Sequence, residues 1–187
     1  LHDQFKDPIT DLPTRIIFED RVSQSMAYST RAKTVMAVAI FNIDMFSRIN
    51  NTLGRVVGDE FLKAVGQRLK TILRRSDTVA SMIAPGQAGP SLSRLHDDEF
   101  ALLLTGLQDV ESLTYVIKRI QDKFSGKIDV SGNEMFVTTT IGLALYPKNA
   151  NTLTGLLREA DQAMYRAKAR CRGVSNISSA DLLEKAM

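Results

Sequence analysis

The sequence predicts an α+β fold in which helices cover a central mixed or antiparallel sheet. Short apolar runs of strand length alternate along the chain with longer segments whose apolar residues recur at helical spacing. Several strand-like runs lie close enough in sequence to pair as antiparallel hairpins. The 187 residues, 44% of them hydrophobic, suffice for one buried core. We therefore expect one domain.

The predicted helices share an apolar stripe that can face a sheet. The first follows Thr14, which can cap a helix that places Phe18, Val22 and Met26 on one face. The other helical segments have the same periodicity and span residues 56–73, 110–124 and 153–167. Together these helices offer enough apolar surface to cover a sheet.

The predicted strands are short apolar runs. Residues 35–41 are apolar without interruption, as expected of a strand that is buried on both faces. Residues 78–84 and 99–105 are expected to pair as one hairpin. Residues 127–131 and 134–146 are expected to form a second hairpin, because a turn-forming pair of residues separates them.

Composition narrows the classes of function. The formal net charge of +3 comes from scattered basic residues, and aromatic residues make up only 6% of the chain, so a nucleic-acid partner is not expected. A single cysteine excludes an internal disulfide and fits a reducing compartment. No apolar run reaches the roughly 20 residues of a membrane span. We expect a cytoplasmic domain, with a membrane anchor elsewhere in a longer protein left open.

Acidic residues gather at the predicted ends of strands. A histidine and three acidic residues precede the apolar run that starts at Phe100, and Asp44 follows the buried strand 35–41. If these strand ends lie side by side, their oxygen atoms would suit Mg²⁺, which can hold a nucleoside triphosphate. Taken alone, acidic residues beside a strand are more often simply solvated. The pattern by itself leaves both interpretations open.

Longer segments resemble a known family. The stretches DPITDLPTRIIFEDRV, FNIDMFSRINNTLGRVVGDEFL, RLHDDEFALLL, VTTTIGLALYP and LLREADQAMYRAKARCRG have the order and approximate spacing found in GGDEF domains. The resemblance covers residues from about 5 to 177. It implies one GGDEF-like domain over residues 1–177, with an insertion loop at about 81–93. The sequences LPTRIIFEDRV and AMYRAKAR are most similar to those of GGDEF domains that precede an EAL phosphodiesterase domain, so residues 178–187 are expected to begin a linker.

The resemblance implies a two-layer sandwich related to nucleotidyl cyclases and to the ferredoxin-like palm of polymerases. Members of the family act in bacterial signalling and make cyclic di-GMP from two molecules of GTP. Their signature hairpin, Gly-Gly-Asp/Glu-Glu-Phe, lets the backbone approach GTP, while acidic residues hold Mg²⁺. Because each subunit holds one GTP, activity requires a homodimer.

The signature departs from the family pattern in this chain. Asp98 and Glu99 match the acidic pair, which makes them the remnant catalytic residues, but His96 and Asp97 replace the two glycines. A side chain at a left-handed turn costs roughly 1–2 kcal/mol. The larger expected effect is that two side chains occupy the space through which the ligand approaches.

The first strand departs as well. The resemblance places metal binding at Asn42, Ile43 and Asp98, and Asn42 stands where the family has an aspartate. Ser47 stands where the family has a lysine near the phosphates. An asparagine oxygen can still contact Mg²⁺, but the full negative charge is lost.

Other positions keep the family pattern, and their roles are implied by the resemblance. Expected contacts are to guanine from Asn50 and Asp59, to the terminal phosphates from Lys168 and Arg172, and to inhibitory cyclic di-GMP from Arg74 and Asp77. For the last pair, an ordinary helix-end arginine with a capping aspartate is an equally good interpretation.

These departures favour a degenerate, catalytically inactive GGDEF domain that regulates an attached EAL domain, either by binding GTP or by transmitting dimer geometry. Mg²⁺ or Mn²⁺ is expected only together with a nucleotide. A first alternative is an active cyclase in which Asp97 supplies the carboxylate that Asn42 lacks. A second alternative is an oligomerisation module without a ligand. An upstream sensory domain is a further expected partner.

Overall fold

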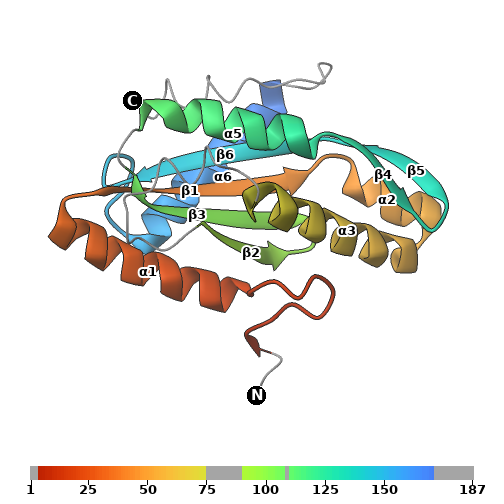
Figure 1. Cartoon of the computed structure of the whole chain (residues 1–187), viewed down its shortest axis with the longest axis horizontal. Helices are drawn as coiled ribbons and strands as arrows, with labels where there is room; N and C mark the ends of the chain where they lie inside the picture. Colours follow the sequence, from red (N-terminus) through yellow and green to blue (C-terminus); the bar gives the residue numbers. More distant parts are fainter. Residues whose placement is uncertain (1–3, 75–89, 108–109, 171–187) are drawn as a thin grey trace.

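The computed structural model describes residues 4–74, 90–107 and 110–170 of the chain (Figure 1). Within these ranges the elements follow one another as α1 (Arg15–Ala32), β1 (Val35–Ile43), α2 (Phe46–Leu53), α3 (Arg55–Arg74), β2 (Ser91–His96), β3 (Glu99–Leu107), α5 (Glu111–Phe124), β4 (Gly126–Val130), β5 (Asn133–Val137), β6 (Thr139–Tyr146) and α6 (Leu153–Arg170). Strands and helices alternate as the periodicity predicts.

The main sheet has the strand order β2-β3-β1-β6, and β4 and β5 form a separate two-stranded sheet. Every pairing between described strands is antiparallel. β1 lies in the middle, where its Asn42 is opposite Glu99 of β3 and Thr140 of β6. The predicted α+β class with a central antiparallel sheet is confirmed.

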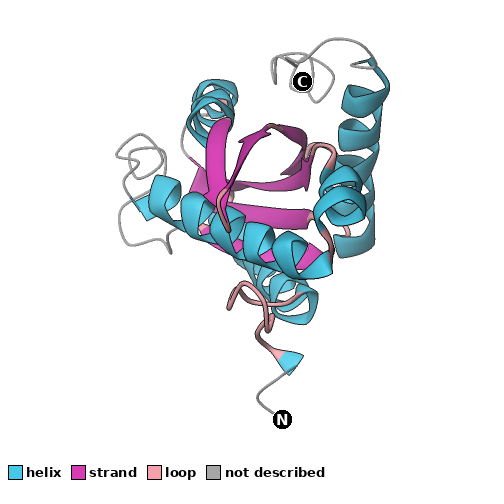
Figure 2. Cartoon of the chain, turned by 90° about the vertical axis from the view of Figure 1, so that its right-hand side faces the viewer, coloured by secondary structure: helices cyan, strands magenta, loops and turns pink. Residues whose placement is uncertain are grey.

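Helices cover both faces of this sheet, so the molecule has three layers, one more than the family resemblance implies (Figures 1 and 2). β1 explains why, because its successive side chains point to opposite faces and all are apolar up to Phe41. One face packs against α1 and α6, around Phe18 and Leu156. The other packs against α3 and α5, around Phe61 and Ile117. An unbroken apolar strand needs a cover on each side.

The predicted helices are confirmed, and the structure adds α2, which ends at Leu53 and is capped by Gly54. Gly54 has a φ of 86°, a conformation that favours glycine and lets the chain turn directly into α3. Among the helices in the described ranges, none combines the length and apolarity needed to cross a bilayer.

The first predicted hairpin has a different arm from the one expected. Its second arm, 99–105, lies within β3, but β3 pairs with Ser91–His96. Residues 91–93 therefore belong to a strand and not to the expected insertion loop, while residues 78–84 lie outside the described residues. The apolar-run criterion missed β2 because its buried residues include Ser93 and Arg94.

The second predicted hairpin is divided between two sheets. Residues 134–137 belong to β5, which pairs with β4 as expected. Residues 139–146 form β6, which pairs with β1 in the main sheet. Apolar alternation continues through both strands, so the sequence pattern does not mark the break at Thr138. This break places Thr138 and Thr140 beside the end of β1.

Candidate functional site

The turn between β2 and β3 carries the expected signature residues. Asp97 and Asp98 form the two-residue connection, and Asp97 has a φ of 38°. Arg94 holds this turn, because its Nε and Nη2 donate to the carbonyl oxygen of Asp97 at 3.0 and 2.8 Å. The left-handed conformation is therefore adopted without glycine at either position. An aspartate accepts it more readily than most residues.

Arg94 also ties the turn to the N-terminal segment. Its Nη1 contacts Asp7 Oδ1 at 2.8 Å, and the two side chains are only 9% and 15% exposed. Asp7 Oδ2 accepts further hydrogen bonds from the backbone N–H and the hydroxyl of Thr10, each at 2.7 Å. Burial raises the pKa of Asp7, but the hydrogen bonds from Thr10 and Arg94 outweigh it and lower the pKa overall. The signature turn thus rests on a largely buried ion pair.

Glu99 lies at the start of β3 and is buried. Burial raises the pKa of its carboxyl group, the charge of His96 opposes this shift, and the charges of Asp161 and Asp98 add to it. His96 Nε2 lies 3.3 Å from Glu99 Oε2. His96, the residue expected in place of a signature glycine, thus lies beside an acid that was expected to be a remnant catalytic residue.

We expect Glu99→Gln to raise the free energy of unfolding at pH 8, because the amide has no charge to desolvate. The raised pKa means that protonated Glu99 stabilises the fold at low pH, and this contribution is lost as the pH rises through the raised value. The advantage of the variant should therefore shrink as the pH falls. Urea unfolding at pH 4 and pH 8 measures it, with exposed Asp122→Asn as the control. A variant less stable than wild type at pH 8 would contradict the assignment.

Asn42 stands at the expected metal position and is engaged by Lys168. Lys168 Nζ donates a hydrogen bond to Asn42 Oδ1. Asn42 is 8% exposed, and its backbone oxygen accepts from Thr139 Oγ1 at 2.9 Å. The side-chain oxygen that would face a metal ion therefore already has an ammonium group as its partner.

The structure brings the three expected metal positions together. Asn42 and Ile43 end β1, and the backbone N–H of Ile43 donates to the carbonyl oxygen of Asp98 at 3.1 Å. Asp44 follows Ile43, but its carboxylate is already hydrogen-bonded within the protein. Its two carboxylate oxygens accept hydrogen bonds from Thr138 and Thr140, each at 2.7 Å.

The donor set at this position fits a divalent cation poorly. Within the described ranges, no three histidine, cysteine, aspartate or glutamate side chains gather as metal ligands. Asn42 contributes no charge and is hydrogen-bonded to Lys168, while Glu99 pairs with His96. Mg²⁺ prefers carboxylate and phosphate oxygens, so Asp98 alone is a weak anchor.

The two residues expected to contact guanine lie on α2 and α3. Asn50 Oδ1 is buried and has no hydrogen-bond partner among the described residues. It lies against Gly58, where an added Cβ would come within 1.8 Å of it. Asp59 follows on α3 and is half-buried, and Ser47 is exposed on α2. A ligand's N–H group could reach this oxygen only if the side chain of Asn50 turned away from Gly58.

The remaining predicted residues are only partly described. Arg74 ends α3, away from the signature turn, while Asp77 and Arg172 lie outside the described residues. The roles of Asp7 and Arg94 were not predicted from the sequence. The local sequence offers only one hint of this contact, a basic residue shortly before an acidic turn. The partner of Arg94, Asp7, is 87 positions away.

Comparisons with known proteins agree with this architecture. The family model described as "Diguanylate cyclase, GGDEF domain" matches residues 4–173. The diguanylate cyclase TpbB of Pseudomonas aeruginosa is 35% identical over 173 residues, which are 92% of this chain and 37% of TpbB. From the same organism, the bifunctional diguanylate cyclase/cyclic di-GMP phosphodiesterase MucR is 31% identical over 89% of this chain and 22% of MucR.

Solved structures extend the likeness to three dimensions. The crystal structure of the GGDEF domain of TpbB has a TM-score of 0.76 and 33% identity, covering 90% of this chain and 98% of that one. A TpbB variant comprising only this domain gives a TM-score of 0.78 at 31% identity, covering 96% and 98% of the two chains. The chain spans less than two fifths of the full-length relatives above. By its sequence and its fold, the chain belongs to the GGDEF domain family.

Proposed function

We propose that this domain serves cyclic di-GMP signalling as a regulatory module that does not make cyclic di-GMP. The observation that carries the proposal is the pair formed by Asn42 and Lys168. A carboxylate at this position would attract a divalent cation, whereas the neutral amide offers only an oxygen that Lys168 already uses. Without the metal, the charge that develops during phosphoryl transfer lacks its main compensation.

The signature turn supports the same proposal. His96 and Asp97 are exposed at the position of the family's glycines, and the imidazole of His96 contacts the carboxylate of Glu99. Their side chains occupy space that glycine leaves open, and Asp97 adds negative charge where a triphosphate would approach. Asp97 is also the residue whose carbonyl Arg94 holds. These features argue against productive placement of the nucleotide for catalysis.

Binding of GTP is the regulatory activity that the remaining geometry favours. The oxygen of Asn50 lacks a donor among the described residues, and guanine carries N–H groups that can supply one once the side chain turns away from Gly58. Lys168 is half-buried near the ends of β1 and β3, within reach of a phosphate if it leaves Asn42. Mg²⁺ or Mn²⁺ would then arrive only with the nucleotide, whose phosphates supply ligands.

An attached EAL phosphodiesterase domain is the proposed target of this regulation. MucR, named as a bifunctional cyclase and phosphodiesterase, supports a tandem arrangement, and so does the cyclic di-GMP phosphodiesterase NbdA, 31% identical over 180 residues. A homodimer and an upstream sensory domain complete the proposal. The name of TpbB favours the alternative, an active diguanylate cyclase.

The first experiment incubates the purified full-length protein with GTP and either Mg²⁺ or Mn²⁺ and measures cyclic di-GMP. We expect none above background, together with calorimetric binding of GTP that Asn50→Ala weakens about tenfold or more. Steady production of cyclic di-GMP that Asp98→Ala abolishes would overturn the proposal in favour of an active cyclase. Absence of any GTP binding would leave a ligand-free oligomerisation module.

The second experiment tests whether Asn42 and Lys168 are what prevents a metal ion from binding. In the double variant Asn42→Asp with Lys168→Met, a carboxylate replaces the amide and the competing ammonium is removed. We expect Mn²⁺ to bind this variant at least tenfold more tightly than wild type, measured by electron paramagnetic resonance without nucleotide. Asn51→Asp adds the same charge at an exposed position of α2 and serves as the control. Equal Mn²⁺ affinity in all three proteins would show that Asn42 is not what excludes the metal.

A further inference from the structure

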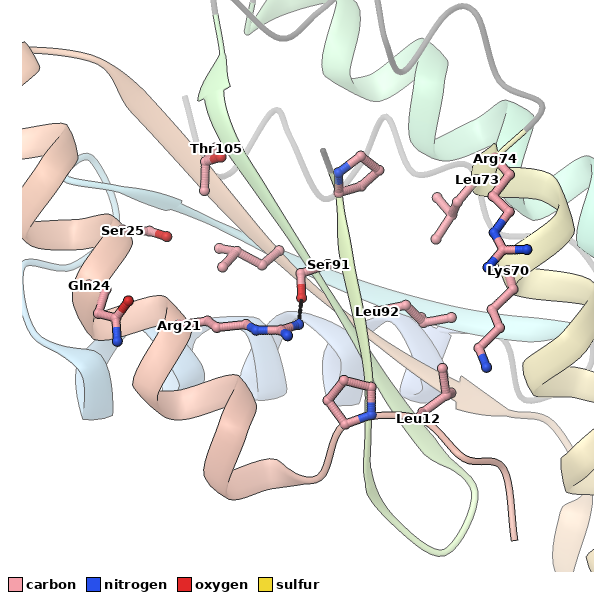
Figure 3. Close-up of a pocket in the computed structure, with 13 residues that line it drawn as sticks. Leu12, Arg21, Gln24, Ser25, Lys70, Leu73, Arg74, Ser91, Leu92 and Thr105 are labelled. Atoms are coloured by element: carbon pink, nitrogen blue, oxygen red, sulfur yellow. Dashed lines mark hydrogen bonds between the residues drawn. The ribbon is translucent and has the colours of Figure 1, made fainter. Parts of the chain in front are cut away.

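A groove lies across strand β2, between helices α1 and α3, and Figure 3 shows the residues that line it. Its volume is about 570 Å³, within the range of pockets that hold small ligands. Arg21, Gln24 and Ser25 come from α1, and Lys70, Leu73 and Arg74 from α3. Ser91 lies on β2 between the two groups (Figure 3).

The described lining of this groove is positively charged. It includes Arg21, Lys70 and Arg74 but no aspartate or glutamate. Within the described ranges, neither Lys70 nor Arg74 makes a hydrogen bond or an ion pair, so their charges are not compensated there. Arg21 is oriented by a hydrogen bond from its Nη1 to Ser91 Oγ at 2.5 Å. Three cations around a concave surface attract an anion.

The rest of the lining is suited to an organic body attached to that anion. Hydroxyl and amide groups that can hydrogen-bond come from Gln24, Ser25 and Ser91. Apolar surface comes from Leu12, Pro13, Leu73, Pro90, Leu92 and Leu103. Pockets that bind small molecules combine an apolar lining with a few placed polar groups in this way.

The groove is separate from the signature site but shares a strand with it. β2 begins at Ser91 in the groove and ends at His96 beside the signature turn, about 17 Å away at 3.4 Å per residue. Leu12 and Pro13 also belong to the segment that Asp7 anchors to Arg94. A ligand in the groove would therefore touch both supports of the turn.

We propose that this groove binds a phosphorylated organic molecule of about nucleotide size, with its phosphates between Arg21 and Lys70. The proposal goes beyond the product contact expected at Arg74 and Asp77, because α1 and β2 contribute to it and because Arg21 and Lys70 supply the charge. It does not depend on how the signature site functions.

The test titrates ADP, pyrophosphate and adenosine separately into the full-length protein by calorimetry. ADP carries both phosphates and a flat base, so we expect it to bind at least tenfold more tightly than either of the other probes. Lys70→Gln and Arg21→Gln should each weaken ADP binding about tenfold. Lys63→Gln removes the same charge from an exposed position of α3 outside the groove and should leave the affinity unchanged.

Three outcomes would overturn the proposal. One is equal affinity for ADP and adenosine, which would show that the phosphates are not recognised. Another is equal affinity of the Lys70→Gln and Lys63→Gln variants, which would place the ADP elsewhere. The third is that Lys168→Met loses ADP binding while Lys70→Gln binds ADP as tightly as wild type, which would assign the ADP to the signature site. Circular dichroism of each variant confirms that it is folded.

Discussion

Replacing Gly142 by alanine is expected to lower the free energy of unfolding by about 3 kcal/mol. Gly142 lies in β6, where α6 packs directly on the strand. A Cβ there would lie 2.0 Å from the backbone oxygen of Ala160 and 2.5 Å from the backbone nitrogen of Met164. Both are backbone atoms inside a helix, so no side chain can rotate away to relieve the contact. Relief requires α6 to shift as a unit.

The same change is expected to disturb the candidate site, because α6 carries Lys168 to Asn42. Urea unfolding followed by circular dichroism measures the stability. The matched control is Gly66→Ala in α3, whose new Cβ would meet its nearest neighbour, Thr10, at an ordinary 3.4 Å. Alanine is the better helix former by about 1 kcal/mol, so this control should keep or gain stability. Equal stability of the two variants would contradict the close packing of α6 on β6.

The helices and the central strand could be predicted because their signals are local. Apolar spacing alone placed the helices that include Phe61 and Leu156, and an unbroken apolar run located β1. β2 could not be found this way, because its buried residues include Ser93 and Arg94. The partner that satisfies Arg94, Asp7, is distant in sequence. Only the folded chain shows why that strand can bury a guanidinium group.

In the candidate site, too, the local motif could be predicted from the sequence and the long-range contacts could not. The motif residues Asn42, Ile43 and Asp98 come together as their order in the family pattern implies. Their interactions with other groups could not be predicted from the sequence. Lys168 reaches Asn42 across 126 positions, and Thr138 and Thr140 reach Asp44 across more than 90. A sequence motif specifies which residue types are present, but these long-range contacts determine which oxygen atoms are left for a ligand.

The substitution Arg94→Met is expected to destabilise the fold by about 3–4 kcal/mol at pH 7. Methionine keeps much of the length of the side chain, but the carboxylate of Asp7, only 15% exposed, is left without its guanidinium partner. The carbonyl of Asp97 loses its two donors in the same step, which releases the left-handed signature turn. Denaturant unfolding measures the loss, and amide exchange at Asp97 and Asp98 reports whether the turn has opened.

The pH dependence and a double-mutant cycle separate the ion pair from simple loss of packing. The pKa of Asp7 is lowered in the folded protein, so its stabilising effect is present above the ordinary value of 3.8 and is lost as the pH falls through the lowered value. The difference in free energy of unfolding between wild type and Arg94→Met should therefore become smaller in acid. At neutral pH, Arg94→Met should cost much less stability when Asp7→Asn is already present. Arg15→Met breaks the exposed pair with Glu19 and should cost no more than about 0.5 kcal/mol. A difference that is independent of pH and unaffected by Asp7→Asn would mean that Arg94 acts through packing alone, and that the N-terminal segment does not support the signature turn electrostatically.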